Sequence, residues 1–217
     1  MIITIDGPAG SGKSTIAELI SKKLNITHFN SGLLYRGIAA HLKSLNFNIL
    51  SMTENSQVPN FTLKTNFINN VQHVYVNDID YTSQLRQNEI STLTPYVSKN
   101  RTIRERIDNC QRSFGANNNI VIEGRDTGSF VFPYAEYKFY LDCNIAERAR
   151  RRYNEEKEKN SNISLKDIEN QLIERDKIDK TKKIAPLVIP KNAIIVDSSN
   201  LSIEQVLNTI LSKININ

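Results

Sequence analysis

The chain has 217 residues, of which 39% are hydrophobic and 24% are charged, and its formal net charge is +5. This composition is typical of a soluble globular protein with one core, and it excludes fibrous, low-complexity and disulfide-framework chains. No apolar run reaches the roughly 18 residues that span a membrane. No secretory signal begins the chain, so we expect a cytoplasmic protein.

The first predicted element is a buried β-strand at Ile2–Ile5, a β-branched run that ends at a Gly-Pro turn. The next segment, Gly7–Ser14, matches the pattern G-x-x-x-x-G-K-[ST]. A helix is predicted from about Lys13, because apolar residues recur on one face after it. This strand–loop–helix context predicts a binding loop for a nucleoside triphosphate.

The residues of this loop have separate tasks. Glycines let backbone N–H groups turn inward, and the helix N-terminus adds positive potential at the same place. Lys13 is placed to reach the β- and γ-phosphates, and the Ser14 hydroxyl is placed to bind Mg²⁺. The predicted nucleotide-binding residues are Gly7, Pro8, Ala9, Gly10, Ser11, Gly12, Lys13, Ser14 and Thr15.

Four further strands are predicted at intervals too long for hairpins. They are Thr27–Phe29, Ile120–Glu123, Tyr137–Leu141 and Ala193–Val196. Near-continuous apolar runs separated by helical stretches predict a parallel sheet covered by helices on both faces.

One region, residues 61–82, interrupts this alternation. Its short alternating segments are separated by the turn formers Asn69-Asn70 and Asn77-Asp78. They predict a small antiparallel insertion that is too short for its own core and therefore leans on the main body.

Positive charge is the second requirement for a kinase whose acceptor is itself a phosphate. Two unit charges 4 Å apart repel by ~4 kcal/mol at an effective dielectric constant of 20, so arginines should gather around the two phosphate groups. Arg36 and Arg125 each follow a predicted strand, at the sheet edge where open α/β sheets bind ligands. The full set of candidates is Arg36, Arg104, Arg125, Arg148, Arg151, Arg175 and Lys182.

The polar stretch Glu147–Lys159 has two interpretations. Arg151–Glu155 and Arg152–Glu156 are spaced as i,i+4 ion pairs, and spacing alone favours a solvated helix. The need for positive charge near the phosphates favours an arginine-bearing lid instead.

Several stretches resemble the cytidylate kinases, within the nucleoside-monophosphate kinase family. Gly124–Pro133, with the pattern G-R-D-x-G-x-x-V-F-P, is far more specific than the phosphate loop. The other matching stretches are Ile5–Ser14, Ser31–Arg36, Glu147–Arg152, and Glu174–Asp176 leading into Ala185–Leu187. Together they span most of the chain.

The resemblance implies an α/β fold with a P-loop core and a parallel five-stranded sheet in a single domain over residues 1–217. It adds a monophosphate-binding insertion at about 60–95 and a helical lid at about 148–182. It also implies Mg²⁺-dependent transfer of the ATP γ-phosphoryl group to CMP or dCMP. We expect a monomer without nucleic-acid or membrane partners.

Site residues follow from the same resemblance. The positions of Ser31, Arg104 and Asp126 face cytosine, those of Arg36, Arg125 and Lys182 hold the acceptor phosphate, and those of Arg175 and Asp179 approach the ribose. Tyr35 lies in a matching stretch and joins the substrate-binding set. The predicted catalytic residues are Lys13, Arg125, Arg148 and Arg151.

Two positions depart from the family pattern. Lysine stands at 182 where arginine is usual, which keeps the charge and loses the planar fork. Pro95 stands where a serine is usual, so Thr94 or Ser98 is left to supply the hydroxyl.

Two alternatives stay open at this point. One is another small-molecule P-loop kinase that acts on UMP or a metabolite. The other is a nucleic-acid-binding P-loop protein, which the net charge of +5 allows. An aromatic content of 7% without tryptophan offers no stacking platform and disfavours the second alternative.

Overall fold

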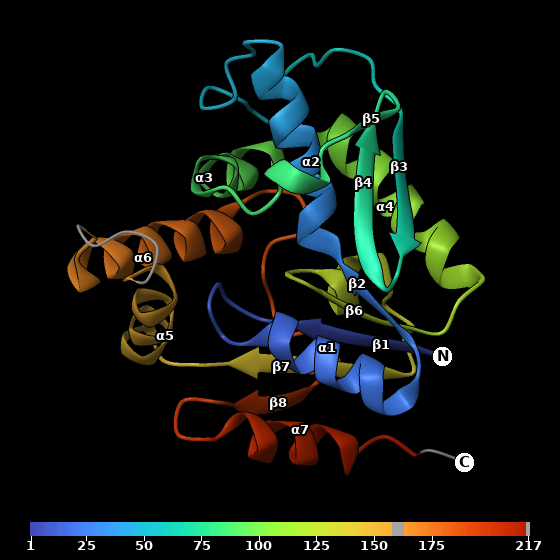
Figure 1. The fold of residues 1–217 in the computed structure, drawn as a ribbon, viewed down its shortest axis with the longest axis vertical. Coiled ribbons are helices and arrows are strands. Elements are labelled where there is room, and N and C mark those ends of the chain that lie inside the picture. Colours follow the sequence, from blue (N-terminus) through green and yellow to red (C-terminus); the bar gives the residue numbers. More distant parts are fainter. Residues whose placement is uncertain (158–162, 216–217) are drawn as a thin grey trace.

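The computed structural model describes residues 1–157 and 163–215, and its centre is a five-stranded parallel sheet with the order β2-β6-β1-β7-β8 (Figure 1). The strands are β1 (Ile2–Asp6), β2 (Thr27–Asn30), β6 (Ile120–Gly124), β7 (Tyr137–Asp142) and β8 (Ile194–Asp197). All five predicted strands are confirmed. The central strand is β1, so the segment after it begins where neighbouring connections diverge, the usual ligand position in such sheets.

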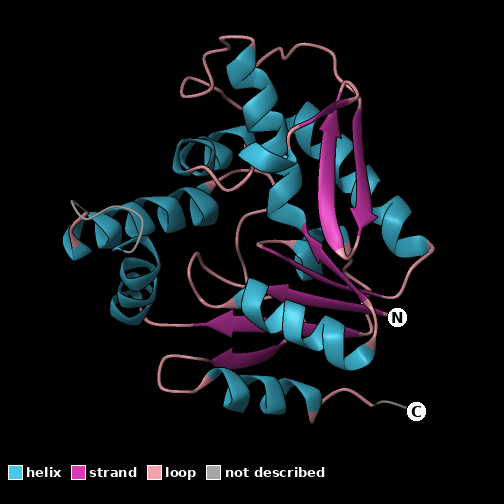
Figure 2. Ribbon diagram, in the orientation of Figure 1, coloured by secondary structure: helices cyan, strands magenta, loops and turns pink. Residues whose placement is uncertain are grey.

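Helices cover both faces of this sheet, as predicted (Figure 2). Along β6, Val121 belongs to one hydrophobic core, while its neighbours Ile120 and Ile122 belong to the other. Helices α1 (Lys13–Leu24) and α7 (Ile203–Leu211) pack on the Val121 side. Helices α2 (Ser31–Ser44), α3 (Asn88–Val97) and α4 (Arg101–Ala116) contribute to the opposite core.

The predicted antiparallel insertion is also confirmed. It contains β3 (Leu63–Ile68), β4 (Val71–Val76) and β5 (Ile79–Asp80), followed by a short 3₁₀ turn at Thr82–Gln84. Its four turn formers all have positive φ, which asparagine and aspartate tolerate best among non-glycine residues. They are Asn69, Asn70, Asn77 and Asp78.

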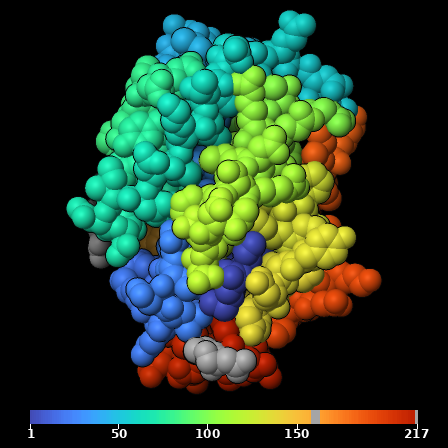
Figure 3. Space-filling view, turned by 90° about the vertical axis from the view of Figure 1, so that its right-hand side faces the viewer, coloured from blue at the N-terminus to red at the C-terminus, as the bar shows by residue number. Residues whose placement is uncertain are grey.

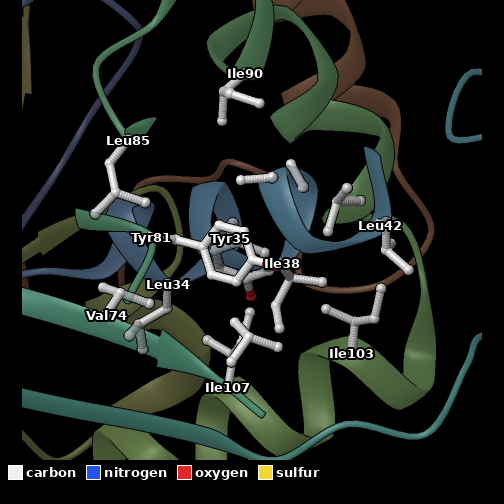
Figure 4. Close-up of a cluster of buried hydrophobic side chains, with 14 of the residues drawn as sticks. Leu34, Tyr35, Ile38, Leu42, Val74, Tyr81, Leu85, Ile90, Ile103 and Ile107 are labelled. Atoms are coloured by element: carbon white, nitrogen blue, oxygen red, sulfur yellow. The ribbon is translucent and has the colours of Figure 1, made fainter. Parts of the chain in front are cut away.

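This insertion has no core of its own and packs on the main body. Val74 and Val76 are fully buried in the same cluster as Leu34 and Ile38 of α2 (Figure 4). The approach is close, since a Cβ on Gly37 would come within 2.5 Å of Val74 Cγ1. On the face shown in Figure 3, the insertion lies beside α4.

Helices α5 (Ile145–Lys157) and α6 (Leu165–Thr181) form a pair at the end of the sheet (Figure 1). Their small core includes Ala9 of the phosphate loop, with Ala149, Ile168 and Leu172. The predicted lid, at about residues 148–182, falls mostly on these two helices, and its residues 158–162 lie outside the described residues. Within the described parts of the chain, no helix has the length and apolar character needed to cross a membrane.

Candidate active site

The phosphate loop lies between the end of β1 and the start of α1, as its sequence pattern predicts. Gly7 has φ of 153°, and a Cβ there would come within 2.2 Å of the Leu141 carbonyl oxygen. Gly12 has φ of 95° and begins α1. Both positions therefore need glycine, and the loop closes tightly against β7 and the helix N-terminus.

Lys13 is buried inside this loop. Its Nζ donates to the Pro8 carbonyl at 2.6 Å and to Ser11 Oγ at 3.3 Å. Burial, and then the nearby Arg125 cation, hold the pKa of Lys13 well below its ordinary value. A bound phosphate would supply the negative charge that this ammonium group lacks.

Ser14 donates a hydrogen bond to Glu123, and Asn30 Nδ2 donates to Glu123 Oε1 at 2.5 Å. Burial disfavours the charged carboxylate, but hydrogen bonds from His28 and Ser14 and the Lys13 cation lower the pKa of Glu123 overall. Glu123 and Asn30 are not among the predicted site residues. Their position in the sequence could have identified them, because Glu123 ends one predicted strand and Asn30 directly follows another.

A cavity of about 710 Å³ opens over the loop. Predicted residues Arg36, Arg125, Arg151 and Arg175 line it together with Lys13. Arg150 and Arg152 line it as well and were not predicted as site residues. Sequence segments more than 100 residues apart therefore bring their positive charge to one place.

Crowding among these cations shows in their proton affinities. Burial, followed by repulsion from Arg125, lowers the pKa of Arg175 to about 9. Burial, followed by repulsion from Arg152, lowers the pKa of Arg36 to about 10. Anions that bound among these side chains would relieve the repulsion.

Arg125 is anchored in the cavity wall by a carboxylate and a backbone carbonyl. Its Nε donates to Asp179 Oδ2 at 2.8 Å, and its Nη1 donates to the Gly124 carbonyl at 3.2 Å. Burial works against the charged guanidinium, yet the Asp179 carboxylate raises the pKa of Arg125. Asp179 therefore holds Arg125 in the cavity wall.

Arg148 contacts the phosphate loop, and its guanidinium is held through Nε and Nη1. Its Nε donates to the Cys143 carbonyl at 2.9 Å and its Nη1 to the Ala9 carbonyl at 3.0 Å, and Nη1 pairs with Asp176 at 2.7 Å. Asp176 Oδ1 in turn accepts from the Ala9 N–H at 3.4 Å. Arg148 and Asp176 therefore hold the backbone of the phosphate loop at Ala9.

The contacts of Arg151 differ from the ion pair that its spacing predicted. Its Nε donates to Glu147 at 2.8 Å, and its terminal nitrogens donate to Ser198, so the predicted Arg151–Glu155 pair is wrong. Ser198 lies after β8 and draws the guanidinium toward the phosphate loop. The predicted Arg152–Glu156 pair is confirmed at 2.7 Å.

A second polar cluster is centred on a buried ion pair between Arg104 and Asp126, neither of which lines the cavity. The Tyr35 ring lies 5.7 Å from the Arg104 guanidinium carbon. Ser31, Asp179 and Lys182 are also buried. The Thr94 and Ser98 hydroxyls donate to the Ile90 and Pro95 carbonyls, while the Ser98 carbonyl accepts from Arg104 at 3.4 Å.

Asp6 joins the two halves of the site. Its carboxylate accepts from the Thr127 N–H and hydroxyl at 2.9 and 2.8 Å and from the Gly128 N–H at 2.7 Å. Burial raises the pKa of Asp6 to about 6. The end of β1, from which the phosphate loop starts, is thereby fixed to the turn that presents Asp126.

Comparisons with known proteins show which chains and folds this one is similar to. The family model for cytidylate kinase matches residues 3–216. A cytidylate kinase of Fusobacterium nucleatum is 40% identical over 99% of this chain and 97% of its own, and one of Clostridioides difficile is 36% identical over 100% and 99%. Among solved structures, TT1252 from Thermus thermophilus shares 14% identity with a TM-score of 0.50, over 100% of this chain and 98% of that one.

Proposed function

This chain belongs to the cytidylate kinase family and transfers the γ-phosphoryl group of ATP to CMP, and from that premise we propose how its residues divide the work. The phosphate loop and Lys13 hold the ATP phosphates. Arg36, Arg125 and Lys182 hold the phosphate of the acceptor. The cavity supports this assignment for Lys13, Arg36 and Arg125, because all three line it and would bring the two phosphates together.

The transfer needs no general base. The acceptor phosphate is already a nucleophile, so catalysis rests on positioning and on neutralising charge between two anions. Arg125 is fixed by Asp179, and burial together with repulsion from the nearby Arg125 lowers the pKa of Arg175. Arg151 reaches the loop from α5, where it is placed to meet the transferred group, while Arg148 keeps the loop in shape.

Mg²⁺ fits the oxygen-rich corner beside the loop. Within residues 1–157 and 163–215, no group of three or more His, Cys, Asp and Glu side chains is arranged to hold a metal. Mg²⁺ prefers oxygen ligands and in kinases takes few from the protein. Ser14, with the Glu123 carboxylate beside it, would hold the ion, which when bound neutralises phosphate charge.

Ser14→Ala is expected to raise the Mg²⁺ concentration for half-maximal rate by about tenfold, because the variant loses a metal-binding oxygen. The KM for CMP should change little. Rates measured over a Mg²⁺ titration check this, with Ser113→Ala, an exposed serine of α4, as the control. An unchanged Mg²⁺ requirement would remove Ser14 from the metal site.

The base site is assigned to the buried pair of Arg104 and Asp126, the structural observation that favours cytosine as the base. Cytosine carries an exocyclic amine that donates, whereas uracil carries a carbonyl that accepts. The Asp126 carboxylate accepts from the amine and repels the carbonyl oxygen. Buried hydrogen-bonding sites of this kind discriminate far more strongly than apolar pockets.

Asp126→Asn is expected to reduce the preference for CMP over UMP by at least about tenfold, since an amide offers a donor to the uracil oxygen. The measurement is kcat/KM for both nucleotides in the wild type and the variant. Asp78→Asn, in an exposed turn, is the control. Equal kcat/KM values for CMP and UMP in the wild type would refute the base assignment.

Two further points complete the proposal. Asp179 and Arg175 lie near the acceptor phosphate site and are proposed to face the ribose, with dCMP as a second acceptor. The second point is the oligomeric state: we propose that the enzyme acts as a monomer.

A further inference from the structure

We propose that Asp108 is a positioning residue for the acceptor base: it retains the Arg104 guanidinium when Asp126 turns its carboxylate toward the cytosine amine. This inference rests on the proposed base site and adds a residue to it.

Arg104 and Asp108 lie one turn apart on the buried face of α4. Arg104 Nη2 is 3.9 Å from Asp108 Oδ1, which is too long for a hydrogen bond, while the same Nη2 hydrogen-bonds to Asp126. Arg104 is 1% exposed and Asp108 is 3% exposed. One guanidinium therefore lies between two buried carboxylates and bonds to only one of them.

Two buried polar atoms of this cluster lack a hydrogen-bond partner in the part of the chain that the structure describes. They are Asp108 Oδ1 and Arg104 Nε. A buried carboxylate oxygen without a partner costs stability. Consistent with that cost, burial raises the pKa of Asp108 to about 6, although the Arg104 cation opposes the shift.

When cytosine binds, the Asp108 carboxylate becomes a partner of Arg104. If the cytosine amine donates to Asp126, that carboxylate shares its lone pairs and holds Arg104 less firmly. Arg104 needs a movement of about 1 Å to shorten its contact with Asp108 to hydrogen-bond length. The guanidinium then keeps a carboxylate partner in both states, so it stays beside the base instead of turning away.

In the protein without CMP, Asp108 also affects the Arg104–Asp126 ion pair and, through it, the preference for CMP over UMP. Without the Asp108 charge, Arg104 has Asp126 as its single carboxylate partner, and the ion pair tightens. A tighter pair leaves Asp126 less available to the cytosine amine. Loss of Asp108 should therefore weaken CMP binding more than UMP binding, with no direct contact between Asp108 and the base.

The test uses Asp108→Asn, which keeps the shape and removes the charge, and Glu105→Gln, the same change at an exposed position of α4. We expect Asp108→Asn to raise the KM for CMP by about tenfold and to lower the preference for CMP over UMP. The kcat and the KM for ATP should stay within about twofold. The Tm should stay the same or rise, because a poorly solvated charge is removed.

Two results would overturn the inference. One is an Asp108→Asn enzyme with the KM for CMP and the CMP preference of Glu105→Gln. The other is a variant with a lower Tm that loses ATP and CMP binding alike, which indicates a structural role. Asp126→Asn separates the inference from its premise: if Asp126→Asn changes the CMP preference and Asp108→Asn does not, only the role of Asp108 fails. If Asp126→Asn has no effect either, the proposed base site itself fails.

Discussion

Lys13→Ala is expected to lower kcat by about 10²- to 10³-fold, with a smaller change in the KM for CMP. The Lys13 ammonium is the buried cation of the phosphate loop, held by the Pro8 carbonyl and Ser11. Its charge matters most when negative charge builds up on the transferred group, so its loss should appear mainly in kcat.

The stability of this variant gives an independent check. Burial lowers the pKa of Lys13, so the charged side chain is costly in the ligand-free protein. Lys13→Ala should therefore keep or raise the Tm while activity collapses. Lys23→Ala, at an exposed position of α1, is the matched control and should match the wild type in both measurements. A kcat within tenfold of the wild type would contradict the assignment of Lys13.

Arg125→Ala is expected to lower kcat/KM for CMP by about 10³-fold or more, because it removes both a phosphate contact and the partner of Asp179. In the ligand-free protein the same change leaves the Asp179 carboxylate buried without its cation. Breaking a buried pair in this way costs about 3–5 kcal/mol of folding stability. Steady-state kinetics and thermal denaturation measure the two effects.

Arg175→Met separates the two effects of Arg125→Ala. Among residues 1–157 and 163–215, no salt bridge involves Arg175, its Nε has no hydrogen-bond partner, and its neighbours include Arg125 and Arg36. Its removal relieves repulsion, so the Tm should hold or rise while kcat/KM for CMP falls as steeply as in Arg125→Ala. Added CMP should raise the Tm of the wild type more than that of Arg175→Met. A lower Tm in Arg175→Met would show that the cation cluster is not strained.

Local patterns determined much of the architecture. The β-branched run Ile2–Ile5, the glycine positions of the loop and the apolar spacing after Lys13 predicted β1, the phosphate loop and α1 within a few residues. The turn formers of the insertion predicted its hairpins. These features depend on residues adjacent in sequence, where backbone sterics and periodicity act directly.

Side-chain contacts between distant segments were harder to predict from the sequence. The Arg151 spacing fitted Glu155 and Glu147 equally well, and the guanidinium points toward Glu147 because Ser198, which follows β8, accepts from its terminal nitrogens. The candidate arginines were found from the sequence, but the engagement of Arg148 by Ala9 and Asp176 was not. A helical spacing shows which side chains share a face and leaves the opposing segment unspecified.

The sequence alone determined the order of the strands and helices along the chain, the nucleotide loop, the family, and four of the arginines that line the cavity, Arg36, Arg125, Arg151 and Arg175. The tertiary structure alone decided which carboxylate each cation contacts: Asp179 for Arg125, Asp126 with Asp108 nearby for Arg104, and Asp176 for Arg148. The physical reason is that a buried charge takes the partner that folding brings within a few ångströms, and for most of these pairs that partner is far away in sequence.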